Sequence, residues 1–240
     1  MPETTRDEMV MSYTRVRLAL GVLGTSLPVV LLIGGLLQEF GIEPTISDFY
    51  YTIYRDLYVG ALCAIGVFLI SYRGYRREPG EWFDDDWLAT AAGIGAFGMA
   101  FFPTPTRDGE IETISQAVVG FAVTPVAHYL FALLFFLSLS LVCFFKFART
   151  ERTGRRRIYI LSGWVMLTSL AATSVAAFHK NYVPGPVAEF VLDHKLIFWF
   201  EAIGVWAFGI SWLVKSRADH ALVRTGKPLQ KPSAADSDGA

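Results

Sequence analysis

Six long apolar runs, almost free of charged residues, constrain this chain more than any other feature of its sequence. Each is about 16–24 residues long, and the charged residues crowd the segments between them. A helix that crosses the hydrocarbon core of a bilayer needs about 20 consecutive apolar residues, and a soluble core has no room for so many runs of this length. We therefore predict an all-α membrane bundle with six transmembrane helices, at Leu18–Leu37, Leu57–Tyr72, Trp87–Phe102, Thr124–Phe145, Ile158–Phe178 and Leu196–Val214.

The third run differs from the others because Ala and Gly take the place of Leu and Ile. Its residues Gly93, Gly95 and Gly98 are of the kind that lets two helices approach closely in a membrane. We therefore expect this helix to lie buried among its neighbours.

The basic residues indicate the orientation. The N-terminal tail, the second and fourth loops and the C-terminal tail together hold 17 of the 21 Lys and Arg residues. Because Lys and Arg are retained on the cytoplasmic side, we predict a plasma (inner) membrane protein with both termini in the cytoplasm. Its parts are a tail over 1–17, a membrane domain over 18–214, and a polar tail over 215–240 that we expect to be disordered.

Other features of the composition exclude little. Cys63 and Cys143 lie within apolar runs, which favours buried free thiols over a disulfide framework. The net charge of −1 says nothing about partners, and no stretch of the sequence suggests nucleic-acid binding. The sequence indicates one partner, the lipid bilayer. It does not indicate the oligomeric state.

The predicted orientation gathers polar residues at the outer face. His128, His179 and His194 each lie near the outer end of a predicted helix. Glu201 lies inside an otherwise uncharged apolar run. A carboxylate in lipid is costly, so Glu201 is expected to face the bundle interior and to have a partner. It is either an acid/base or ligand residue of an outer pocket, or part of a structural hydrogen-bond network.

The segment before the second run contains further candidates. If it is helical, Asp48, Thr52 and Asp56 share one face, with Arg55 beside them. Such carboxylates are candidates for an acid, a base or a metal ligand, and Ser47 lies next to them. The alternative is structural, with Ser47 or Asp48 as a helix cap and Arg55 and Asp56 as an ion pair.

Zinc is the cofactor that these residues allow. A catalytic zinc site takes three protein ligands and leaves one position for water. His128, His179 and His194 are the candidate ligands, with Asp48 or Asp56 as a fourth ligand or as the base. The sequence has no HxxxH or HExxH motif, so each ligand must come from a different segment.

Several stretches resemble an uncharacterised family of bacterial six-pass membrane proteins. They are Ser47-Asp-Phe-Tyr-Tyr-Thr52 with Arg55-Asp56, Gly60–Tyr75, Phe101-Phe-Pro-Thr104, His128 with Leu134–Ser138, and Phe198-Trp-Phe-Glu201. This resemblance implies the six-pass architecture and no reaction. A more distant similarity is to the alkaline-ceramidase and adiponectin-receptor-like hydrolases, which hold zinc in a helical bundle. Those proteins have seven spans and an HxxxH pair in the last helix, which this chain lacks.

Two classes of function follow from these observations. The first is a metal-dependent or His/Asp-dependent hydrolase of a lipid or lipid-linked substrate. Its candidate catalytic residues are Ser47, Asp48, Arg55, Asp56 and Glu201. The second is a non-enzymatic protein, either a small-molecule carrier or an interaction or structural protein of the membrane.

Overall fold

The computed structural model describes residues 3–39, 41–72, 84–105, 113–149 and 153–225, and within these ranges the regular structure is entirely helical. The helices are α1 (Glu3–Leu37), the 3-10 helix η1 (Ser47–Tyr51), α2 (Arg55–Ile70), α3 (Asp85–Phe101), α4 (Ile114–Val119), α5 (Val123–Val142), the π-helical turn η2 (Cys143–Phe147), α6 (Thr153–Tyr182), α7 (Pro186–Asp193) and α8 (Leu196–Thr225). The prediction of an all-α membrane protein is confirmed.

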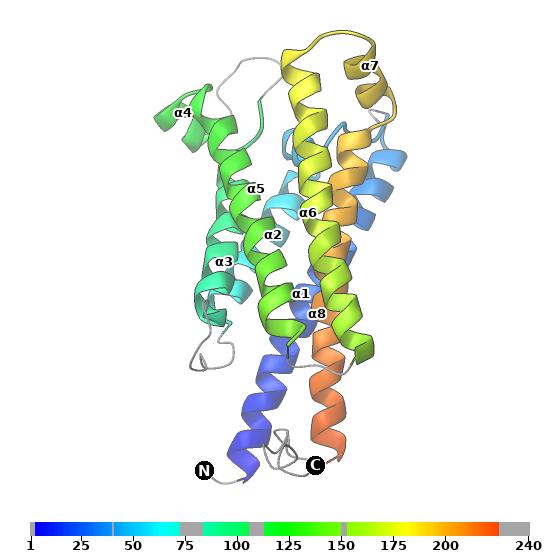
Figure 1. The fold of residues 1–240 in the computed structure, drawn as a ribbon. Coiled ribbons are helices and arrows are strands. Elements are labelled where there is room, and N and C mark those ends of the chain that lie inside the picture. Colours follow the sequence, from blue (N-terminus) through cyan, green and yellow to red (C-terminus); the bar gives the residue numbers. More distant parts are fainter. Residues whose placement is uncertain (1–2, 40, 73–83, 106–112, 150–152, 226–240) are drawn as a thin grey trace.

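The long helices form one bundle in which successive members run in opposite directions (Figure 1). The first residues of α1 and the last turns of α8 lie at one end of the bundle, and the short helices α4 and α7 lie at the other. Among the residues that the structure describes, four segments are long and apolar enough to cross a membrane, namely Tyr13–Leu37, Val123–Phe147, Gly154–Tyr182 and Leu196–Arg217. The other two long members, α2 and α3, are shorter, with 16 and 17 residues.

Small residues bring the helices together, as the third apolar run predicted. A Cβ atom at Gly93 would lie 2.9 Å from the carbonyl oxygen of Gly66, so α2 and α3 touch through their backbones. A Cβ at Gly95 would lie 2.8–3.0 Å from backbone atoms of α5. Between α1 and α8, a Cβ at Gly209 would lie 2.9 Å from the backbone of Gly24. Close approach of this kind supplies the packing that holds helices together in lipid.

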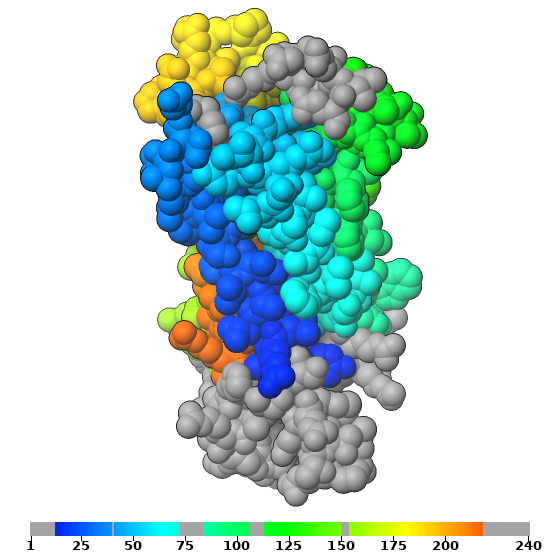
Figure 2. Space-filling model, turned by 180° about the vertical axis from the view of Figure 1, so that it is seen from behind, coloured from blue at the N-terminus to red at the C-terminus, as the bar shows by residue number. Residues whose placement is uncertain are grey.

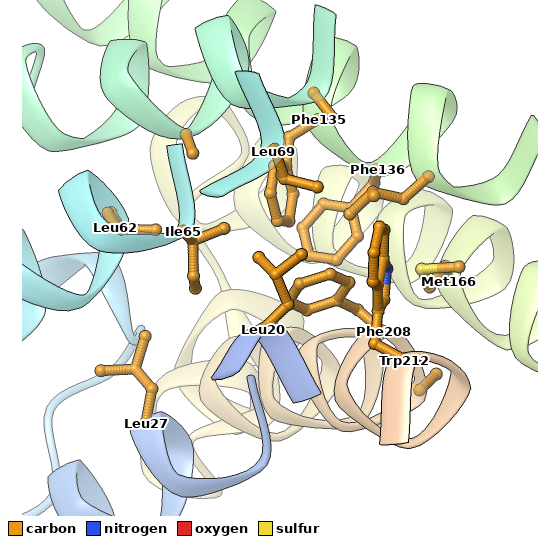
Figure 3. Packing of buried hydrophobic residues seen from close by; sticks show 14 of the residues in the cluster. Leu20, Leu27, Leu62, Ile65, Leu69, Phe135, Phe136, Met166, Phe208 and Trp212 are labelled. Carbon is orange, nitrogen blue, oxygen red and sulfur yellow. The ribbon is translucent and has the colours of Figure 1, made fainter. Parts of the chain in front are cut away.

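Aromatic and aliphatic side chains from all six long helices fill the centre of the bundle, and Figure 3 labels several of those from α1, α2, α5, α6 and α8. Phe135 of α5 packs edge-on against Phe136 and Phe208, with ring centroids 5.2 Å and 5.6 Å apart. Leu20 of α1 and Met166 of α6 complete this layer and have no exposed surface. The interior is therefore a mainly apolar core, in which the buried polar side chains of the helix middles are serines such as Ser138 and Ser169.

Helices α1 and α8 extend beyond the predicted spans into the two predicted tails. Helix α1 begins at Glu3, so most of the predicted tail over 1–17 is helical. Helix α8 continues beyond Val214 to Thr225, and residues 226–240 lie outside the described part. Lys215, the first residue beyond the predicted end, is packed into the bundle, since it is 1% exposed and its ammonium lies 5.4 Å from the centroid of the Phe147 ring.

Candidate functional site

The segment between α1 and α2 folds into the end of the bundle. Ser47, Asp48, Phe49 and Tyr50 of η1 are all buried. Phe49 packs against Phe198 of α8, with ring centroids 6.2 Å apart, and the Thr45 hydroxyl accepts a hydrogen bond from the Asp48 backbone N–H at 2.8 Å. Burial of the Phe49 ring places the neighbouring polar residues inside the protein. Because a buried polar group without a hydrogen bond is costly, these residues need partners there.

Ser47 and His128 form the most informative contact. Ser47 Oγ lies 3.0 Å from Nε2 of His128, and Nδ1 of His128 lies 2.7 Å from the carbonyl oxygen of Phe102. A carbonyl oxygen only accepts, so Nδ1 carries the ring proton and Nε2 accepts from the Ser47 hydroxyl. The Tyr58 hydroxyl points at the same serine oxygen from 3.5 Å. This is the arrangement of a hydroxyl nucleophile, a base and a group that orients the base.

Asp48 makes different contacts from its neighbour Ser47. Its Oδ2 pairs with the ammonium of Lys180 at 3.2 Å, and its Oδ1 accepts from the Thr104 hydroxyl at 3.1 Å. The Thr104 carbonyl in turn accepts from the hydroxyl of Tyr51 at 2.5 Å. Asp48 is therefore an ion-paired carboxylate beside the Ser47–His128 pair and is not the group that orients the histidine.

Glu201 reaches the same segment from α8. Its Oε2 accepts the backbone N–H of Ile46 at 2.6 Å, and Ile46 is only 4% exposed. The sequence predicted an inward-facing carboxylate with a partner, and the structure supplies a backbone group as that partner.

Two adjoining cavities lead to these groups. The larger, about 310 Å³, is lined by Asp48, Lys180, His128 and Glu201 together with apolar side chains of α6. The smaller cavity, about 70 Å³, is also lined by His128 and Glu201, and in addition by Ser47 and Tyr58. A ligand of mixed character fits such walls, because polar groups and apolar side chains both line the cavities.

Thr173 lines both cavities, and sequence analysis missed it. Its hydroxyl is buried and has no hydrogen-bond partner among the described residues. Its neighbour Ser174 instead donates to the Leu170 carbonyl at 2.8 Å, as serine and threonine commonly do within helices. A threonine in an apolar helix carries no sequence signal that would have singled it out.

The structure separates Arg55 and Asp56 from the rest of the predicted site. The chain leaves η1 at Thr52, which has an extended backbone with φ −118° and ψ 175°, and α2 begins only at Arg55. The helical face predicted for Asp48, Thr52 and Asp56 is therefore not formed. Arg55 and Asp56 line a different hollow, between α2, α3 and α4.

The three predicted zinc ligands are not brought together. His194 is exposed at the end of α7, where its Nδ1 lies 3.0 Å from the Phe190 carbonyl. Nδ1 of His179 is buried without a hydrogen-bond partner among the described residues, whereas both ring nitrogens of His128 are engaged. Within the described part of the chain, no group of three or more His, Cys, Asp or Glu side chains is placed to hold a metal ion.

Comparisons with known proteins bear on the family and not on the reaction. No curated protein and no solved structure matches the chain, so the more distant similarity to the ceramidases gains no support. A family model described as "Protein of unknown function (DUF998)" matches residues 29–206, which is well over half of the chain and includes all of the site residues above. The predicted membership of an uncharacterised family is confirmed, and the chain belongs to the DUF998 family.

Proposed function

We propose that this protein is an integral membrane hydrolase that cleaves an ester of a lipid or lipid-linked substrate. Ser47 is the nucleophile and His128 its general base. One observation carries the proposal: Ser47 Oγ lies 3.0 Å from His128 Nε2 while Nδ1 is held by the Phe102 carbonyl at 2.7 Å. A nucleophile that is hydrogen-bonded to a base, which is in turn hydrogen-bonded to an orienting group, is the geometry that covalent hydrolysis uses.

The topology in this proposal has six spans, with both termini in the cytoplasm. Arg17, near the middle of α1, donates to the Tyr72 hydroxyl beyond α2 at 2.9 Å, and the ammonium of Lys215 of α8 lies 5.4 Å from the centroid of the Phe147 ring of η2. These contacts gather basic residues of separate segments at one end, as the retention of Lys and Arg in the cytoplasm requires. At about 1.5 Å per residue, α2 and α3 cross a bilayer that is locally thinned.

The chemistry follows from this arrangement. His128 Nε2 takes the Ser47 proton as Oγ attacks the ester carbonyl carbon, and the same proton then goes to the departing alcohol oxygen. Water afterwards attacks the acyl–Ser47 ester, again with His128 as base, and restores the serine. The hydroxyls of Tyr58 and Thr173, which line the same small cavity, are the candidate donors to the carbonyl oxygen as it becomes negative.

A second candidate is a non-enzymatic carrier or structural protein of the membrane. One observation favours it: the Ser47, Asp48 and Glu201 side chains all have protein partners that hold the η1 segment in place. A network that satisfies its own members is what a structural role requires.

Labelling with a serine-reactive fluorophosphonate separates the two candidates. The full-length protein in lipid nanodiscs is treated with the probe, and the labelled residue is identified by peptide mass spectrometry. We expect modification of Ser47 that is lost in Ser47→Ala and reduced at least tenfold in His128→Gln. The matched control is Ser174→Ala, which removes another hydroxyl from the wall of the larger cavity. An unlabelled Ser47 in folded protein, with no ester hydrolysis, would overturn the hydrolase and favour the second candidate.

Metal analysis tests the zinc-dependent form of the hydrolase. That form predicts about one zinc per chain, lost in both His128→Ala and His194→Ala. The Ser47–His128 form predicts that labelling and hydrolysis persist after dialysis against a chelator.

A further inference from the structure

A second hollow lies on the outside of the bundle, apart from the Ser47–His128 site. It is an open groove of about 780 Å³ between α2, α3 and α4. Val59 and Gly60 of α2, Phe101 of α3, and Ile114 and Val118 of α4 are among the residues that line it. Figure 2 shows the face of the molecule on which α2 and α3 lie side by side. Ser47, His128, Tyr58 and Thr173 do not line this groove, whereas Phe102, whose carbonyl oxygen holds His128, is among its lining residues.

The groove is open to lipid. Ile114 and Val118 are 84% and 76% exposed, and Phe101 is 54% exposed. Large apolar side chains exposed together in this way mark a surface that another molecule covers. Because α4 lies at the end of the bundle (Figure 1), its apolar side chains are at the level where acyl chains meet the headgroups.

Two opposite charges stand at the polar end of the groove. The guanidinium of Arg55 donates to the Tyr50 hydroxyl at 2.8 Å and lies 4.3 Å from the centroid of that ring. It is therefore held in place before any ligand arrives. Asp56 is exposed, and its carboxylate has no hydrogen bond or ion pair with another described residue. The groove thus offers a fixed cation and an available anion next to an apolar trough.

We propose that this groove binds one phospholipid with a zwitterionic headgroup made of a phosphate and a primary ammonium. The phosphate contacts Arg55, the ammonium contacts Asp56, and one acyl chain lies between α2 and α4. Arg is well suited to phosphate because its planar fork presents parallel N–H donors. The Asp56 carboxylate repels a purely anionic headgroup, and a quaternary ammonium has no N–H to donate to it.

Native mass spectrometry of the full-length protein tests this preference. The detergent-solubilised protein is titrated separately with phosphatidylethanolamine, phosphatidylglycerol and phosphatidylcholine of identical acyl chains. We expect one retained phosphatidylethanolamine and at least about tenfold weaker retention of the other two, as the loss of one charge-assisted hydrogen bond implies. Arg55→Gln weakens retention of all three lipids, whereas Asp56→Asn removes only the preference for phosphatidylethanolamine. Asp193→Asn, an exposed acid at the end of α7, leaves both unchanged.

Gly60→Leu tests the position of the acyl chain. A Cβ atom at Gly60 meets nothing within 4 Å, so a leucine there fills the groove without disturbing the fold. We expect at least a tenfold loss of phosphatidylethanolamine retention. Gly154→Leu is the matched control, because a Cβ at Gly154 also meets nothing within 4 Å and that residue begins α6 at the other end of the bundle.

Other outcomes would overturn the proposal. Equal retention of the three lipids would mean that the groove takes ordinary boundary lipid, and an unchanged Gly60→Leu would place the bound lipid elsewhere. A dimer that Gly60→Leu dissociates would assign the groove to a second copy of the chain. Labelling of Ser47 does not depend on this groove, so either proposal can fail while the other stands.

Discussion

The contact between Glu201 and the Ile46 backbone leads to a quantitative prediction for stability. In the structure the backbone N–H of Ile46 donates to Oε2 of Glu201 at 2.6 Å. In Glu201→Leu this buried N–H loses its acceptor. A buried donor left unsatisfied costs about 1–3 kcal/mol, so we take about 2 kcal/mol for this one. For a chain of this length each kcal/mol lowers the melting temperature by about 2–4 °C, which gives an expected loss of about 4–8 °C.

The measurement is thermal unfolding of the purified protein in detergent, followed by tryptophan fluorescence. Glu201→Gln keeps a side-chain oxygen that can accept the Ile46 N–H, so we expect less than half of the loss seen with leucine. The matched control is Glu189→Leu, because Glu189 is an exposed carboxylate on α7 that has no hydrogen bond or ion pair with another described residue. Its melting temperature is expected to stay within about 1 °C of the wild type.

Two results would refute this reasoning. If Glu201→Leu melts with the wild type, the Ile46 contact does not hold the η1 segment in the bundle. If Glu201→Gln is as unstable as the leucine variant, the charge of Glu201 matters and the hydrogen bond does not. In the second case a cation, such as nearby Lys180 in the larger cavity, would be the partner to test next.

Three further predictions concern the site and its packing. Thr173→Val lowers the turnover number of ester hydrolysis about tenfold to a hundredfold with little change in KM, and Thr173→Ser restores it, as expected for a donor to the oxyanion. Gly95→Val lowers the yield of folded protein and its melting temperature, because the new side chain meets backbone atoms of α5 within 3.0 Å; Gly60→Val, in open space, does neither. A double-mutant cycle with Asp48→Asn and Lys180→Met yields a coupling energy of about 1 kcal/mol for this partly exposed pair, and additive effects would contradict the ion pair.

The long helices could be predicted from the sequence because lipid demands an unbroken apolar run. The predicted run Trp87–Phe102 corresponds to α3 at Asp85–Phe101, and Leu57–Tyr72 to α2 at Arg55–Ile70. The short helices α4 and α7 were not predicted, since segments of six and eight residues lack the length that makes a periodic pattern visible. The extension of α8 was missed because the polar and charged residues after Val214 end the apolar run on which the prediction depended.

The sequence predicted in part which residues form the site, but it did not predict which of them form hydrogen bonds with each other. Sidedness alone placed Ser47, His128 and Glu201 at the same end of the bundle, and the structure brings all three around one small cavity. The orienting group of His128 is the backbone carbonyl of Phe102, which every residue type provides and no sequence pattern identifies. The separation of Asp56 from Asp48 depends on the extended backbone at Thr52, and no pattern in this tyrosine-rich segment predicts that conformation.

Thr173 is the residue on which the structural and catalytic accounts differ most. A structural network explains why Ser47, His128 and Glu201 are satisfied, because a buried polar group without a partner costs about 1–3 kcal/mol. It does not explain a buried threonine hydroxyl that bonds to no described residue and lines the cavity beside them. Ser174 shows that a helix carbonyl is available to a hydroxyl in this stretch. In the proposed hydrolase this hydroxyl, which lines the same cavity as Ser47 and His128, is available as a donor to the developing oxyanion.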